Sequence, residues 1–174
     1  VCLQFIHSDV IGAIRHAICM LARRGFPRIS LVITEKSSQP IEDDFYRICS
    51  EAPRPIEGEV VRISEDLQEQ HLAVKRLAAR ITGRYALVAN SPVPAGLLLM
   101  SLMKRGVDVP GQVEVIAINA LPVEIRTFPL ITHYPYPLER FSKAVCQAAM
   151  RYFEQGALPP LRKLIPLQMV APPR

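Results

Sequence analysis

The fold of this chain is decided by residues 85–118, which read YALVANSPVPAGLLLMSLMKRGVDVPGQVEVIAI. The stretch opens and closes on short apolar runs at 85–89 and 113–118, a pattern typical of parallel strands that are covered on both faces. Between them, Asn90 and Ser91 are favoured N-cap residues, and Pro92 suits the first position of a helix. Gly106 suits the residue just after that helix. We therefore predict one strand–helix–strand unit.

The same unit recurs along the chain. In the first helical pattern, Ile14, Ala17 and Leu21 repeat at the spacing of one buried stripe, and a similar stripe runs from Val74 to Ile81. Strands that alternate with helices predict an α/β fold, a doubly wound, mainly parallel sheet flanked by helices. Ligands bind such sheets at the carboxyl ends of the strands. The other apolar runs lie at 1–6, 29–33, 59–63 and 164–170, the other helical patterns at 41–50 and 138–152, and the other helix stops at Gly25, Gly83 and Gly156.

Length and charge limit the classes of protein that fit. The 174 residues suit one domain with a sizeable core, and 49% of them are hydrophobic. The net charge of +5 is dispersed and is not interleaved with stacking aromatics, which favours a solvated basic surface over a nucleic-acid interface. No apolar run is long enough to cross a bilayer, so we expect no membrane partner.

The reactive side chains predict neither a metal site nor an enzyme. No cysteine forms a CxxC pair, and no histidine lies at metal-ligand spacing from one, so we expect no metal, no cofactor and buried free thiols in a reducing cytoplasm. The histidines lack a serine or cysteine nucleophile in a recognisable motif, and no Gly-rich phosphate loop is present. The acidic run Glu42-Asp43-Asp44 suits an exposed helix face. The cysteines are Cys2, Cys19, Cys49 and Cys146; Cys19 and Cys146 lie among apolar neighbours.

Three segments, in order and at similar separations, resemble the LacI/GalR family of bacterial transcriptional regulators. They are 24–29 (RGFPRI), 85–91 (YALVANS) with the small pair Ala95-Gly96 after it, and 105–117 (RGVDVPGQVEVIA). The third is the most specific, and 128–132 and 161–170 fit the family's closing segments. The resemblance implies a periplasmic-binding-protein-like fold. It also implies that the chain is the C-terminal part of the effector-binding domain of a DNA-binding repressor.

The resemblance also divides the chain. It implies a second lobe at about 8–131 and 161–174, with 132–160 forming the crossover and a helix of the first lobe. The DNA-binding headpiece and most of the first lobe would lie outside residues 1–174. Operator DNA would then be bound only through that absent headpiece, in a homodimer.

By the same resemblance, Asn90 and Asn119 line the effector cleft, and Ser91 and Glu42 stand at neighbouring ligand positions. The family has an acidic residue where this chain has Asn119, and an arginine near Glu42, so a guanidinium fork is expected to be missing. Asparagine can still bond a hydroxyl of a small polar effector such as a sugar. An equally good interpretation is that Asn90 and Ser91 only cap the following helix.

Residues 133–137 (HYPYP) lie where the family chain crosses between lobes. Tyr134 could stack on a sugar ring, or the tyrosines could pack against the lobe edge of a proline-stiffened connection, which we favour.

The dimer face implied by the resemblance comprises Pro94, Leu97, Leu98, Val123 and Phe128, although core packing explains the apolar helix equally well. The competing functional class is a solute-binding protein of a sugar transport system, which shares the two-lobe fold. A free-standing flavodoxin-like interaction module is the third possibility.

Overall fold

One parallel sheet forms the centre of the molecule. The computed structural model describes residues 5–37, 39–120, 131–156 and 162–172. Five strands pair in the order β3-β2-β4-β5-β6, all parallel. Every residue of the central strand β4 is buried, as its apolar run predicted. The strands are β2 (Arg28–Thr34), β3 (Glu57–Ile63), β4 (Tyr85–Ala89), β5 (Val113–Ala120) and β6 (Thr132–Pro135).

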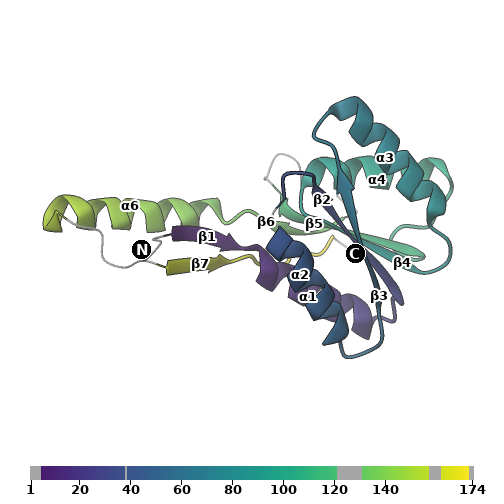
Figure 1. Cartoon of the computed structure of the whole chain (residues 1–174), viewed down its shortest axis with the longest axis horizontal. Coiled ribbons are helices and arrows are strands. Elements are labelled where there is room, and N and C mark those ends of the chain that lie inside the picture. The colour runs from purple at the N-terminus through teal and green to yellow at the C-terminus, as the bar shows by residue number, and fades with distance from the viewer. Residues whose placement is uncertain (1–4, 38, 121–130, 157–161, 173–174) are drawn as a thin grey trace.

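Helices cover both faces of this sheet (Figure 1). Helices α1 (Val10–Arg23) and α2 (Gln39–Ser50) contribute to one cluster of buried side chains, and α3 (Leu67–Arg80) and α4 (Pro92–Lys104) contribute to the other. The predicted stripe on α1 is confirmed, since Ile14, Ile18 and Leu21 are fully buried. The prediction of a doubly wound, mainly parallel α/β sheet is therefore confirmed. We call this unit the lobe.

The remaining elements form a separate extension, which we call the arm. Strand β1 (Phe5–Asp9) pairs in parallel with β7 (Arg162–Pro166), and α6 (Leu138–Gln155) packs against β1. Figure 1 shows these three elements reaching away from the lobe. Of the described residues of α6, only Ala144 is buried. Leu138, Val145 and Tyr152, which belong to the predicted stripe, are 43–56% exposed.

The structure shifts the expected boundary of the crossover. Residues Thr132–Pro135, which we expected in a connection between lobes, pair in parallel with β5 and form the edge of the lobe sheet. The final strand pairs with β1 in the arm, and only afterwards does Val170 return to bridge His133 on the lobe. A His-Tyr-Pro segment is extended in a linker and in an edge strand alike, so sequence could not separate the two.

The predicted helix ends agree with the structure more closely than the predicted first and last strands do. The four glycines predicted to end helices have positive φ, at 67–80°. Within the described residues, the first strand is Phe5–Asp9, so it runs three residues past the predicted run at 1–6, whose first four residues lie outside the described ones. The last strand lies at Arg162–Pro166, earlier than the predicted 164–170.

The cysteines differ in burial, and one of them differs from our expectation. Cys49 is buried and burial raises the pKa of its thiol to about 11, whereas Cys146 is exposed on α6. The expectation of a buried Cys146 was wrong because the apolar stripe of α6 is not covered within the described part of the chain. Cys2 lies outside the described residues.

Candidate functional site

Unpaired buried amide oxygens gather at the carboxyl ends of the lobe strands. Asn90 follows β4 and Asn119 lies near the end of β5, and they are the only asparagines in the sequence. The side-chain oxygen of each is buried and accepts no hydrogen bond from the described residues. An unpaired buried acceptor costs about 1–3 kcal/mol, so a ligand hydroxyl that donates here would be strongly favoured.

Gln70 also carries a buried amide oxygen without a partner, and sequence reasoning missed it. It is 5% exposed in the first turn of α3, and its Nε2 donates to the Ser64 carbonyl just beyond β3 over 3.4 Å. Its Oε1 is buried without a partner among the described residues. The signal in the sequence was a polar residue placed four positions before Val74, on the buried stripe of its helix. The three amides together mark one edge of the sheet.

The backbone sets the direction of Asn119. Its φ is 58°, in the left-handed region that asparagine tolerates better than most residues, and the β5–β6 register shifts between Ile118 and Ala120. A bulge of this kind turns one side chain out of the ordinary alternation of a strand. Asn119 is therefore half-buried, whereas the other residues of β5 are buried.

Ser91 occupies the N-cap of α4 without capping it through its side chain. Its backbone is extended, and its hydroxyl accepts no cap hydrogen bond. Because Pro92 and Pro94 have no N–H, Val93 supplies the only free amide among the first three helical residues. This end of α4 therefore has fewer free donors than its N-cap pattern predicted. The interpretation that Ser91 serves as a side-chain cap is not supported.

Glu42 is tied to an arginine that the sequence pattern did not reveal. Arg62, on β3, donates from Nη2 and Nε to one carboxylate oxygen of Glu42 over 2.7 and 3.2 Å. Its Nη1 donates to the carbonyls of Glu35 and Ser37 over 3.3 and 3.1 Å. A guanidinium does lie near Glu42, supplied by β3, but it is bonded within the protein, so the expected lack of an arginine that clamps a ligand stays a prediction. Most of the donors of Arg62 are already used within the protein.

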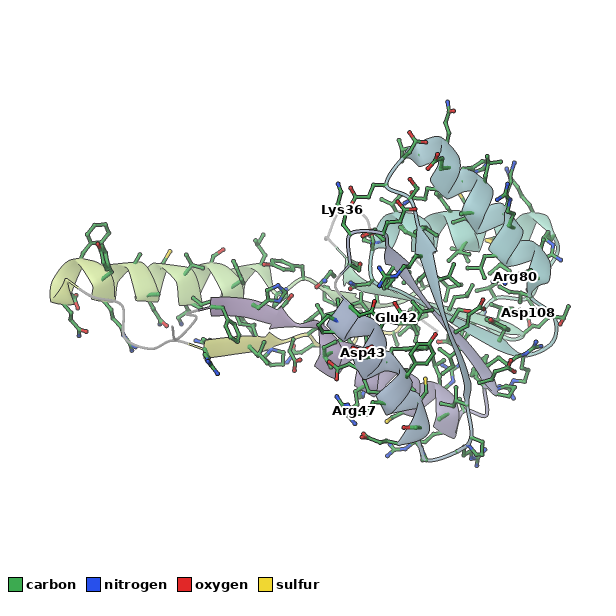
Figure 2. All side chains as sticks on the ribbon, viewed as in Figure 1. Lys36, Glu42, Asp43, Arg47, Arg80 and Asp108 are labelled. Atoms are coloured by element: carbon green, nitrogen blue, oxygen red, sulfur yellow. The ribbon has the colours of Figure 1, made fainter. Side chains whose placement is uncertain are left out.

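A second ion pair joins the segments that follow β2 and β3. Lys36, after β2, forms an ion pair with Glu65, after β3. Figure 2 shows Lys36 on the side of the lobe nearer the arm, while Arg80 and Asp108 lie on the far side. The carboxyl edge thus carries unpaired amides, with its loop cations neutralised by neighbouring carboxylates.

Of the two tyrosines at 133–137, the structure assigns the pocket-facing position to Tyr136. Tyr134 is 1% exposed, and its hydroxyl lies 2.7 Å from Nδ1 of His16, so its proposed contact with a ligand is corrected to a core role. Tyr136 is half-buried beside Phe141, with ring centroids 5.6 Å apart. It lines a pocket of about 410 Å³ between the end of β6 and the start of α6.

The proposed dimer residues divide by exposure. Pro94 and Leu98 are buried in the lobe, Leu98 within an apolar core cluster, and Leu97 is half-buried. The structure therefore does not present Pro94 and Leu98 on the surface, where the predicted dimer face would need them. The accessible apolar residues of α4 that share a face with Leu97 are Val93 and Met100, 44% and 49% exposed. Val123 and Phe128 lie outside the described residues.

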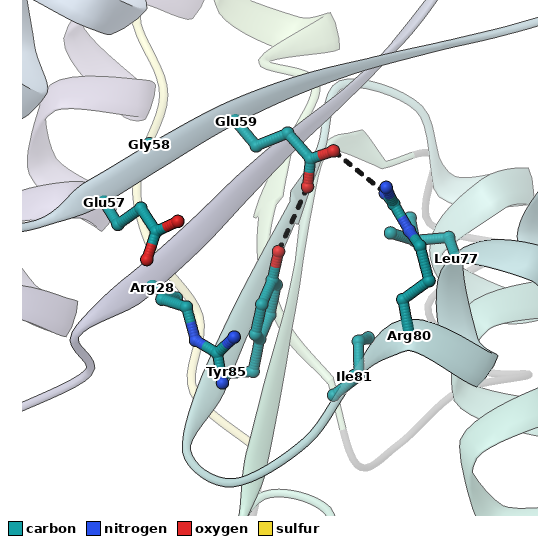
Figure 3. Close-up of a pocket in the computed structure, with 8 residues that line it drawn as sticks. All are labelled: Arg28, Glu57, Gly58, Glu59, Leu77, Arg80, Ile81 and Tyr85. Atoms are coloured by element: carbon teal, nitrogen blue, oxygen red, sulfur yellow. Dashed lines mark hydrogen bonds and ion pairs between the residues drawn. The ribbon is translucent and has the colours of Figure 1, made fainter.

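A separate pocket lies at the amino ends of the strands. It encloses about 430 Å³, and Figure 3 shows Glu59 between Arg80 and Tyr85 in its wall. Glu59 pairs with Arg80 at 2.9 Å and accepts from the Tyr85 hydroxyl at 3.3 Å, and that hydroxyl also bonds Ser30 at 2.7 Å. Burial is the main cause that raises the pKa of Tyr85. These groups satisfy one another, unlike the amides of the carboxyl edge.

The described residues hold no cluster of side chains suited to a metal ion. Among the described helices, none has the length and apolar character that crossing a membrane requires.

Fold and comparison together define the class of this protein. The family model of the periplasmic binding protein-like domain matches residues 18–171, and the chain belongs to that family. The comparison with curated proteins gives no match.

The solved structures similar to this chain include LacI-family transcriptional regulators. One, from Arthrobacter sp. FB24 in complex with lactose, has a TM-score of 0.81 at 15% identity, covering 95% of this chain and 63% of its own. A complex of the transcriptional regulator CelR with cellobiose gives 0.80 at 18%, covering 98% and 53%. A regulator from Enterococcus faecium with bound ribose gives 0.79 at 14%, covering 98% and 66%. This chain thus spans between about half and two thirds of their lengths, and the likeness shows a shared fold.

Proposed function

We propose that this chain is the effector-sensing and dimer-forming part of a LacI/GalR-type transcriptional repressor. The observation that carries the proposal is the set of unpaired buried amides at the carboxyl edge, where ligands bind open parallel sheets. The fold similarity to regulators solved with lactose, cellobiose and ribose supports the same assignment.

The chemistry of the edge favours a neutral polyhydroxyl effector. Asn90, Asn119 and Gln70 present amide oxygens that lack donors, and a sugar hydroxyl can supply a donor while accepting from an amide nitrogen. The guanidinium of Arg62 and the ammonium of Lys36 are already paired with Glu42 and Glu65. An anionic effector would have to break these pairs, whereas a neutral sugar would not.

The regulatory step in this proposal is a change in lobe arrangement. The arm would join a first lobe outside residues 1–174, so that an effector bound between lobes shifts the balance between two arrangements. Dimer contacts through α4, with Val123 and Phe128, would carry the shift to two DNA-reading headpieces. Val93, Leu97 and Met100 are the α4 residues assigned to that contact, because they share one accessible face.

Ligand binding is tested by calorimetric titration of the purified protein, together with any upstream lobe that its gene encodes, with lactose, cellobiose and ribose. The variants are Asn90→Ala and Asn119→Gly, the latter because glycine accepts the positive φ without strain. We expect binding of at least one sugar and a loss of affinity of about tenfold or more in each variant, as for a hydrogen bond worth roughly 1.4 kcal/mol. The matched control is Gln68→Ala, since Gln68 is exposed on α3.

Absence of heat with all three sugars, or full affinity in both asparagine variants, would count against a sugar effector at this edge. The regulator assignment is tested separately by the coding sequence upstream of Val1. We expect a helix-turn-helix followed by another α/β lobe. A cleavable signal peptide before a lobe would instead support the solute-binding protein of a transport system.

A further inference from the structure

Three arginines surround Gly25 at the amino edge of the lobe, the edge opposite the proposed effector site. Arg24 lies at the end of α1, Arg54 precedes β3, and Arg84 precedes β4. The Nη1 atoms of Arg54 and Arg84 each lie 3.8 Å from the position that a β-carbon on Gly25 would take. We call Arg24, Arg54 and Arg84 the Gly25 arginine cluster. All three residues are exposed.

The cluster is held in place from beneath by an aromatic ring. Phe26 is 2% exposed, and the guanidinium carbons of Arg84 and Arg24 lie 4.7 and 5.7 Å from its ring centroid. Nη2 of Arg84 also donates to the Arg24 carbonyl over 3.1 Å. Stacking and one backbone bond fix the plane of Arg84 and leave its other N–H groups available.

The charges of the cluster are only partly compensated. Arg24 pairs with the buried carboxylate of Glu114 at 2.8 Å. Within the part of the chain that the structure describes, Arg54 and Arg84 form no ion pair. Two guanidinium groups beside the same glycine therefore repel each other, and an anion bound to both would relieve the repulsion.

Stabilisation of helix ends explains the basic residues at this edge only in part. Cations in the last turn of a helix stabilise its dipole, which accounts for Arg23 on α1 and Arg80 on α3. Arg54 and Arg84 lie beyond the last turns of α2 and α3, where that effect has fallen away. Beside Gly25, at the end of α1, Arg84 donates to the Arg24 carbonyl and so helps to cap that helix, whereas Arg54 makes no such hydrogen bond within the described residues.

We propose that the Gly25 arginine cluster binds carboxylate side chains of an acidic segment of a partner protein. A guanidinium plane matches a carboxylate through two parallel hydrogen bonds, as suits the fixed plane of Arg84. The cluster lies on an open surface, so its ligand comes from a partner's surface and not from an enclosed metabolite.

Nucleic acid fits this surface less well. Phe26 and Tyr85 are buried, so neither presents a ring on which a base could stack.

The test measures binding of a fluorescein-labelled hexaglutamate peptide to the whole chain by fluorescence anisotropy. The variant is Arg54→Gln/Arg84→Gln. The matched control is Lys75→Gln/Arg76→Gln, which removes the same charge from the exposed face of α3. We expect the first pair to weaken binding about tenfold or more, and the control to change it less than about twofold. A hexaglutamine peptide should not bind.

Because Arg84 also packs on Phe26, the single variant Arg54→Gln is measured as well, with thermal unfolding to show that each variant is folded. Arg54→Gln alone should still weaken binding several-fold. The proposal is overturned by any of three results: no binding of hexaglutamate, equal losses in the variant and the control, or tighter binding of a random DNA duplex that depends on the same two arginines. None of these results bears on sugar binding at the carboxyl edge.

Discussion

At the residue scale, the contrast that matters is between buried polar groups that are paired and those that are not. Ser30 bonds Tyr85 at 2.7 Å, and Glu114 accepts from Thr132 at 3.1 Å while pairing with Arg24. These groups lie toward the amino ends of their strands. Asn90 and Asn119, toward the carboxyl ends, retain unpaired oxygens. At the amino end, only Glu114 Oε2 among these groups lacks a hydrogen bond within the described residues, and it is ion-paired with Arg24, whereas the amide oxygens at the carboxyl end lack any partner there.

Tyr134 supports a prediction about alkaline pH. Burial raises the pKa of its phenol from 10.0 to about 12, so the unfolded chain loses this proton at lower pH than the folded chain. The part of the free energy of unfolding that comes from this pKa difference is therefore fully present below pH 10. It is lost as pH rises from 10 to 12. The loss is at most about 3 kcal/mol.

In Tyr134→Phe we expect the free energy of unfolding to fall by about 1 kcal/mol at pH 7, because the bond to His16 is lost, and to decline less steeply above pH 10. Urea unfolding between pH 7 and 11.5 checks this. Tyr152→Phe, at a half-exposed position, is the control and should follow the unsubstituted chain. A Tyr134→Phe profile parallel to that of the unsubstituted chain would contradict the assignment.

At the scale of elements, two helices begin at different kinds of N-cap. Asp66 accepts from the amides of Gln68 and Glu69 over 2.9 and 3.0 Å, so its side chain satisfies the start of α3. Ser91 makes no such bond at α4, whose first turn contains two prolines. A helix that needs less capping leaves its N-cap hydroxyl free for another role.

Capping by Asp66 but not by Ser91 predicts unequal costs for the same kind of substitution. Asp66→Ala should lower the free energy of unfolding by about 1 kcal/mol, whereas Ser91→Ala should change it by less than about 0.5 kcal/mol. Chemical denaturation of both variants measures the difference. A loss of 1 kcal/mol or more in Ser91→Ala would mean that its hydroxyl caps α4 after all.

At the scale of the whole molecule, the lobe buries its apolar side chains, whereas the arm leaves large apolar side chains of α6 exposed. The lobe buries two clusters of apolar side chains, one on each face of its sheet. The arm leaves Met150 and Phe153 of α6 61% and 84% exposed. In the proposed regulator, the rest of the first lobe would cover this surface.

Assembly through α4 can be separated from assembly through the arm. If α4 forms the dimer contact, Leu97→Glu/Met100→Glu should convert a dimer into a monomer in sedimentation velocity experiments, because two charges would be buried at the interface. Leu72→Glu, at an exposed position on α3, is the control and should remain dimeric. If the α4 variant stays dimeric and Phe153→Ser becomes monomeric, the arm forms the contact instead.

Much of the fold, and part of the site, could be predicted from sequence. Apolar runs located the buried strands β2, β4 and β5, and residues such as Gly106 located helix ends, because these signals depend on local periodicity and backbone preference. Asn90 was found because it follows such a run at the start of a helix, and Asn119 was found through the resemblance to the LacI/GalR family. Gln70 was missed because its burial depends on where α3 packs.

What the sequence determined by itself was therefore the alternation of strands and helices, the doubly wound parallel class and the position of two asparagines at strand ends. Only the tertiary structure brought Arg62 to Glu42, buried Tyr134 against His16, and gathered Arg54 and Arg84 around Gly25. Each of these contacts joins residues far apart along the chain. They depend on strand order, register and packing, which the local pattern of side chains does not encode.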